Sequence, residues 1–211
     1  MTPETTPEPM GRAAWRAAWR DRRFRATSLG SVLVLVLTMA GFSRFVLWVE
    51  SRPGSRLDDP VLAWLEPRDL NALTFGLIYG CLVLALIVLV PRPRRLMLAV
   101  RTYVVVVLVR MLLMWLAPLE PPESLIALRD PLVEWFGEGQ ALTRDLFFSG
   151  HVATGFVLAL ACPLRVPRAL LFAATVVVGA AMLVQHAHYA VDVAAAPLLA
   201  YACWTAARRV A

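Results

Sequence analysis

The chain has no lysine, and only three cysteines and three histidines among its 211 residues. The cysteines (Cys81, Cys162 and Cys203) are far apart and all fall within apolar stretches. They therefore form neither a disulfide framework nor a zinc-ligand pattern. Charged residues make up only 17% of the chain and hydrophobic residues 59%, which excludes an ordinary soluble domain. In so apolar a chain, the net charge of +6 does not indicate nucleic-acid binding.

The sequence also lacks an internal repeat and any change of composition that would mark a second domain. It has no pattern of a cleavable signal peptide: the first apolar run begins only after Thr27, exceeds the length of a signal core and has no small-x-small site behind it. We expect one domain at 29–207, an N-terminal arm at 1–28 and a short tail at 208–211. Residues 1–10 are rich in Thr, Pro and Glu, which predicts disorder.

What the chain does contain is a series of apolar stretches that approach the roughly 20 residues a helix needs to cross a bilayer. They predict an all-α polytopic membrane protein built as a six-transmembrane-helix bundle. The predicted spans are 29–49, 70–90, 96–116, 146–164, 169–184 and 189–207. Before the first span, residues 11–25 carry arginine on one helical face and Trp and Ala on the adjoining one. This predicts either an interfacial amphipathic helix or a positive flank that only fixes topology.

The arginines indicate the orientation of the predicted bundle. With six spans, the N-terminal arm, the links after spans two and four, and the tail all lie on one side and hold most of the arginines. The opposite loops, 50–69 and 119–145, hold five arginines and eleven acidic residues. The positive-inside rule then predicts a plasma (inner) membrane protein with both termini cytoplasmic. The outer loop is also expected to contain a short surface helix at 132–136.

Two polar clusters interrupt the apolar pattern. The first, residues 145–151, is Asp-Leu-Phe-Phe-Ser-Gly-His and begins the fourth span; the second, residues 186–192, is His-Ala-His-Tyr-Ala-Val-Asp and begins the sixth. Ionisable groups at membrane depth are costly and usually functional. Because the predicted topology puts both clusters at the outer end of the bundle, we expect them to form one site facing the periplasmic or extracellular side.

The residue types in these clusters indicate phosphoryl transfer. Asp192 follows His188 by four residues and can reach its ring if that turn is helical. A carboxylate on one ring nitrogen fixes the tautomer and leaves the other nitrogen as a nucleophile. His151 can protonate a departing oxygen, and the Ser149-Gly150 turn can offer backbone N–H groups to an anion. Together they predict a metal-free route through a phosphohistidine, with no cofactor.

The remaining candidates supply positive charge or support. Arg110, in the outer half of the third span, is the first choice for binding phosphate, and Arg144 is the second. Asp145 is expected either to join the site or to cap the fourth span. His186 is expected to hydrogen-bond locally and Tyr189 to be an interfacial aromatic, so both are accessory candidates.

A metal site is the competing interpretation, because two histidines and one carboxylate can bind zinc or iron. The chain has no His-Glu-x-x-His pattern, and a metal would leave the Ser-Gly before His151 without a role. We therefore predict no metal.

These residues resemble a known family. Phe148-Ser-Gly-His151 with His188-x-x-x-Asp192 looks like the type 2 phosphatidic acid phosphatase superfamily. The segments 145–151 and 183–192 are more similar to its sphingomyelin-synthase branch, as are Arg94-Arg95, Tyr103, Arg110 and Leu116-Ala-Pro118. The resemblance covers residues 90–195. It implies that His188 is the nucleophile, Asp192 its partner and His151 the acid, acting without metal on lipid phosphoesters at the exoplasmic face.

Departures from the family pattern bear on the reaction. The phosphatase signature Lys-x-x-x-x-x-x-Arg-Pro is absent, Phe148 replaces the Pro usual in phosphatases, and Ala181 and Met182 stand where phosphatases have Ser-Arg. Ala190 and Val152 replace threonines of the synthase branch. The resemblance implies an enzyme that passes a phosphate-bearing head group from a phospholipid donor to a lipid alcohol acceptor, ceramide-like or diacylglycerol-like. The alternatives are a phosphatase acting on phosphatidic-acid-like or prenyl phosphate lipids, and a non-catalytic lipid transporter or scaffold.

Overall fold

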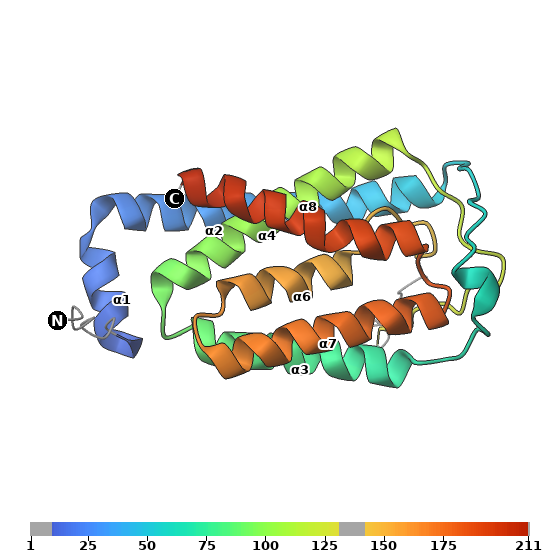
Figure 1. Ribbon diagram of the computed structural model, residues 1–211. Helices are drawn as coiled ribbons and strands as arrows, with labels where there is room; N and C mark the ends of the chain where they lie inside the picture. Colours follow the sequence, from blue (N-terminus) through green and yellow to red (C-terminus); the bar gives the residue numbers. More distant parts are fainter. Residues whose placement is uncertain (1–9, 131–141, 211) are drawn as a thin grey trace.

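The computed structural model describes residues 10–130 and 142–210, and in these ranges its regular structure is helical (Figure 1). The helices are α1 (Gly11–Arg20), α2 (Arg22–Glu50), α3 (Asn71–Leu89), α4 (Pro93–Leu116), α6 (Gly150–Ala161), α7 (Arg165–Val184) and α8 (Ala190–Val210), with a 3-10 turn at Leu62–Trp64. The expected disorder of residues 1–9 and the expected helix at 132–136 lie outside the described residues.

Within the described residues, α2, α3, α4, α6, α7 and α8 run alternately between the two ends of one bundle, so α1 and the end of α8 lie at the same end (Figure 1). Five of these helices, all except α6, are long and apolar enough to cross a membrane. The all-α prediction is confirmed for the described residues. Helices of this length and hydropathy indicate an integral membrane protein.

The fourth predicted span differs most from the structure. It was expected at 146–164, but α6 has only 12 residues, or about 18 Å at 1.5 Å per residue. The hydrocarbon core of a bilayer is about 30 Å thick. The helix ends because Cys162, which precedes Pro163, is extended, as proline disfavours a helical residue before it. Since α6 packs against α3, α4, α7 and α8, it is enclosed by longer helices and does not itself need the length of a span.

The N-terminal helix is shorter than the predicted 11–25. It ends at Arg20, and the carboxylate of the next residue, Asp21, accepts hydrogen bonds from the N–H groups of Arg23 (2.9 Å) and Phe24 (3.3 Å) and so caps α2. Buried Ala18 packs with Phe24 and Met97, which fixes α1 against α2 and α4. The arginines of α1 are exposed on its other side.

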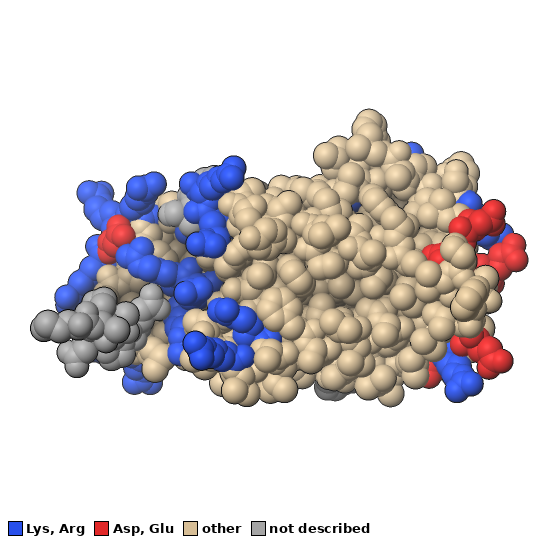
Figure 2. Space-filling view, in the orientation of Figure 1, with Lys and Arg blue, Asp and Glu red and all other residues tan. Residues whose placement is uncertain are grey.

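Charge is segregated between the two ends of the bundle. Figure 2 shows arginine gathered at the end that carries α1, and most of the visible acidic side chains at the opposite end. The basic residues come from α1, the start of α2, the link between α3 and α4, the start of α7 and the end of α8. The acidic end is formed by the loops that precede α3, α6 and α8, where both sequence clusters lie.

Candidate active site

The two polar clusters meet, as expected from the alternation of helices. Ser149 immediately precedes α6, and its backbone N–H donates to the carbonyl oxygen of Asp192, in the first turn of α8 (3.2 Å). Both residues are fully buried, and α6 packs along α8. A hydrogen bond between backbone groups thus joins two segments that are more than forty residues apart in the chain.

Asp192 orients the ring of His188. Its Oδ2 lies 3.2 Å from His188 Nδ1 and also accepts the N–H of Tyr189 (3.1 Å), so one oxygen both caps the start of α8 and holds the imidazole. Because a carboxylate only accepts, Nδ1 carries the hydrogen and Nε2 presents its lone pair. The i, i+4 contact is made at the helix N-terminus, since His188 precedes α8.

The Nε2 atom of His188 is the free end of this pair. It has no hydrogen-bond partner among the described residues. Among the described residues, the side-chain nitrogen and oxygen atoms that are fully enclosed and have no hydrogen-bond partner are Ser28 Oγ, Ser149 Oγ and Asp192 Oδ1. Because Nε2 is not one of them, it is not fully enclosed. The His188 side chain as a whole is only 4% exposed. The small exposed part of this side chain therefore includes Nε2, the nitrogen with the free lone pair.

Arg110 is buried and held by the segment that precedes α6. Its Nε donates to the carbonyl oxygen of Phe148 (2.8 Å), and its Nη2 pairs with Asp145 Oδ1 (2.9 Å). The Arg110 side chain is 6% exposed, and its Nη1 has no hydrogen-bond partner among the described residues. Asp145 therefore positions this arginine and does not cap α6, whose start has no side-chain cap.

Gly150 is the residue that lets the guanidinium lie against the start of α6. A Cβ at this position would be 2.6 Å from Arg110 Nη1 and 2.8 Å from Cζ. The first N–H groups of an α-helix have no partner within it. Here they lie beside a buried guanidinium, and a helix N-terminus with an adjacent positive charge is suited to binding an anion.

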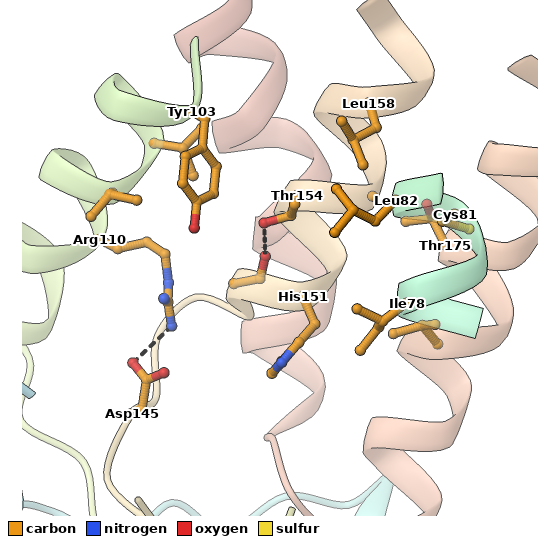
Figure 3. Close-up of a pocket in the computed structure, with 15 residues that line it drawn as sticks. Ile78, Cys81, Leu82, Tyr103, Arg110, Asp145, His151, Thr154, Leu158 and Thr175 are labelled. Atoms are coloured by element: carbon orange, nitrogen blue, oxygen red, sulfur yellow. Dashed lines mark hydrogen bonds and ion pairs between the residues drawn. The ribbon is translucent and has the colours of Figure 1, made fainter. Parts of the chain in front are cut away.

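A cavity of about 240 Å³ opens beside this group. Arg110, Asp145, Gly150 and His151 line its polar end, and Figure 3 shows that Arg110, Asp145 and His151 face the same space. The His151 ring packs edge-to-face against Phe75, with centroids 6.0 Å apart. His151 is within electrostatic reach of Arg110, Asp145 and His188. His188 is not among the residues that line this cavity.

No protein-family model and no curated protein matches this chain. A functional assignment therefore depends on the geometry of the four groups just described: Arg110, His151, His188 and Asp192. Across residues 10–130 and 142–210, no three side chains of His, Cys, Asp or Glu are grouped so that they could hold a metal ion.

His186 is held by two loops. Its Nε2 lies 3.1 Å from the carbonyl oxygen of Leu65, and its Nδ1 lies 2.5 Å from Ser124 Oγ. Because a carbonyl only accepts, Nε2 carries the hydrogen and Nδ1 accepts from the serine hydroxyl. Neither ring nitrogen is available for chemistry. The expected hydrogen-bonding role is correct, but the partners come from distant loops and not from neighbouring residues.

Tyr189 is buried within the protein, with 1% of its surface exposed, so it is not the surface aromatic of the membrane interface that was expected. Its hydroxyl donates to the carbonyl oxygen of Glu120 (2.9 Å) and accepts from the N–H of Leu57 (3.3 Å). It thereby joins the loops before α3 and after α4 to the start of α8.

Replacing Tyr189 with phenylalanine should destabilise this end of the bundle. Both hydrogen bonds are lost and the Leu57 N–H is left without its partner, which costs about 1–2 kcal/mol. Thermal unfolding in detergent should show a lower Tm, while the activity of each folded molecule is retained. An unchanged Tm would show that the hydroxyl does not hold the loops.

Arg144, the second choice for phosphate, is not brought to the cavity. Its guanidinium pairs with Glu120 Oε2 (2.9 Å) and donates to the carbonyl oxygen of Arg52. The backbone N–H groups of Thr143 and Arg144 bond to the carboxylate of Glu50 at the end of α2. These bonds anchor the segment that carries Asp145, so Arg144 supports the site from outside it.

Sequence reasoning missed Gln185, which is fully buried beside the second cluster. Its Oε1 accepts the N–H of Leu70 (3.0 Å) and its backbone carbonyl accepts the N–H of Ile126 (2.9 Å). It joins the end of α7 to the start of α3 and to the loop after α4. A glutamine inside an apolar stretch was a signal for such a role, since an unpaired amide there is costly.

Proposed function

We propose that the protein is a membrane lipid phosphotransferase that moves a phosphate-bearing head group from a phospholipid to a lipid alcohol through a phosphohistidine at His188. The observation that carries this proposal is the juxtaposition of the Asp192-oriented His188 with the anion-binding start of α6. The bond from Ser149 N–H to the Asp192 carbonyl oxygen joins these two parts. Neither part would have an evident use alone.

Substrate binding in this proposal begins with the anionic phosphoester. Its oxygens accept hydrogen bonds from the first N–H groups of α6 and from Nη1 of Arg110, the donor that no described residue uses. Charge-assisted bonds of this kind are about twice as strong as neutral ones. Asp145 keeps the guanidinium in place and leaves the N–H donors of Nη1 free, because the pair uses Nη2.

The first chemical step forms a bond from His188 Nε2 to phosphorus and breaks the bond from phosphorus to the glycerolipid oxygen. His151 gives its proton to that oxygen, and diacylglycerol leaves. In the second step the acceptor hydroxyl attacks phosphorus and returns a proton to His151, while the P–N bond breaks. Asp192 stabilises the positive charge that develops on the His188 ring. Atoms and protons balance over the two steps.

The same proposal includes the membrane arrangement. The arginine-rich end, with both termini, faces the cytoplasm, and the acidic end with the site faces the periplasmic or extracellular side. Helix α6 makes the fourth of the six passages of the chain, inside the ring of longer helices. Helix α1, with its exposed arginines, lies in the cytoplasmic interface, and the membrane is the plasma (inner) membrane.

A product analysis tests the function. The purified protein in detergent is offered mixed phospholipids with ceramide or diacylglycerol as acceptor, and the lipids are identified by mass spectrometry. We expect a new phospholipid built on the supplied alcohol, together with released diacylglycerol. Free phosphate formed without need of an acceptor would identify a phosphatase. A protein that binds lipid without converting it would support a transporter or scaffold and contradict the proposal.

A further inference from the structure

The cavity at the candidate site has a second, apolar end. Beyond Arg110 and His151 it continues between α3, α4, α6 and α7 (Figure 3). The apolar lining residues there are Ile78, Cys81 and Leu82 of α3, Val106 and Val107 of α4, Leu158 of α6 and Val178 of α7. A space with the free hydrogen-bond donor of Arg110 at one end and an apolar lining at the other is complementary to an anionic amphiphile.

The threonines in this lining do not make it polar. The Thr154 hydroxyl donates to the carbonyl oxygen of Gly150 (2.7 Å), and the Thr175 hydroxyl donates to that of Leu171 (2.7 Å). Each hydroxyl hydrogen is thus used within its own helix. The Tyr103 hydroxyl, in contrast, has no hydrogen-bond partner among the described residues and faces the space near Arg110.

The cavity also opens toward the side of the bundle. Leu82 lines it and is nevertheless 40% exposed, and Cys81 is partly exposed. Although α3 and α4 are consecutive, α3 packs mainly on α7 and α4 mainly on α2 and α8, so the two helices leave a seam between them. Cys81 is near the middle of α3, at the depth of the hydrocarbon in a membrane helix.

We infer that the seam between α3 and α4 is a lateral entry for the lipid substrate, and that one hydrocarbon chain lies along Cys81 and Leu82 while its phosphate rests at Arg110. This inference rests on the proposed function for the identity of the substrate. At about 240 Å³ the space is smaller than the roughly 300–1,000 Å³ of typical ligand pockets. The cavity holds the part of one hydrocarbon chain that is near the head group, and the rest of the lipid stays in the bilayer.

Photolabelling tests the entry without requiring turnover. The full chain in nanodiscs of neutral lipid is given a phosphatidic acid that carries a diazirine within one acyl chain, irradiated and mapped by mass spectrometry. We expect adducts on Cys81, Leu82 and Val106 that excess unlabelled phosphatidic acid removes. An excess of a neutral amphiphile that is neither donor, product nor acceptor, such as a fatty-acid methyl ester, should leave them in place.

Two variants and one matched control locate the site. Cys81→Trp fills the apolar end, and Leu82→Trp obstructs its mouth; each should reduce the competable labelling at least about tenfold, a change of ~1.4 kcal/mol or more. Val83→Trp, on the neighbouring face and 56% exposed outside the lining, should not. Size-exclusion profiles show which variants remain folded, and having two fillers allows for the failure of either one.

The outcomes separate the inference from the proposed function. Competable adducts in the seam without any lipid conversion would support the lateral entry and contradict the proposed enzymatic function. Lipid conversion with adducts only on outward-facing residues, or with labelling unchanged in both tryptophan variants, would overturn the entry while leaving the enzyme.

Discussion

Replacing His188 with alanine is expected to lower the rate of head-group transfer by about 10⁴-fold or more, the scale seen when a catalytic nucleophile is removed. The loss follows from the absence of Nε2, the one accessible nitrogen of the Asp192-oriented pair. The measurement is the initial rate of lipid product formation by purified protein, normalised to the folded fraction.

His186→Ala is the matched control, two residues away. Both ring nitrogens of His186 bond to loop residues, so this change should lower Tm and leave the rate of each folded molecule within a few-fold of the parent. If His188→Ala turned over lipid at the parent rate, the proposed nucleophile would be wrong. If the two variants lost activity equally, a general disturbance of the loops would explain both.

Gly150→Ala should lower turnover by about 10²-fold, because a displacement of about 1 Å in a binding group can have that effect. The new Cβ would lie 2.6 Å from Arg110 Nη1, so the guanidinium must move away from the start of α6. Gly150 has no positive φ, so alanine suits its backbone and the helix should still form. The measurement is kcat and KM together with thermal unfolding.

Gly80→Ala serves as the control, since a Cβ there meets nothing within 4 Å. A double-mutant cycle with Arg110→Lys adds a test that a general packing effect would not pass. Because Gly150 acts through the guanidinium, the two changes should be strongly non-additive. Additive losses, or a Gly150→Ala protein with parental kinetics, would show that the close approach of Arg110 has no role in turnover.

Much of the site was predictable because its residues follow local rules. The i, i+4 spacing of His188 and Asp192 led to the observed contact, and the alternation of apolar stretches led to the meeting of the two clusters. Arg110 was singled out because a buried guanidinium needs partners, and the structure supplies Asp145 and the Phe148 carbonyl oxygen; its phosphate-binding role stays a prediction. The predicted helix bounds were mostly close to those observed, because runs of apolar residues are also a local feature of the sequence.

The features that sequence reasoning did not predict depend on distant parts of the chain. The buried position of Tyr189 is set by Leu57 and Glu120, and neither is near it in sequence. Helix α6 can be short because four other helices enclose it, and no local hydropathy pattern encodes that enclosure. The clearance between Gly150 and Arg110 is likewise a tertiary contact.

The most direct test of the account is to trap the covalent intermediate. The purified protein is mixed with a phospholipid labelled in its phosphate, denatured under alkaline conditions that preserve phosphohistidine, and digested for mass spectrometry. The account predicts the phosphate-bearing group on His188, lost in His188→Ala and diminished in Asp192→Asn, which cannot stabilise the charged ring in the same way. Label on another residue, or no label from a preparation that is turning over lipid, would contradict it.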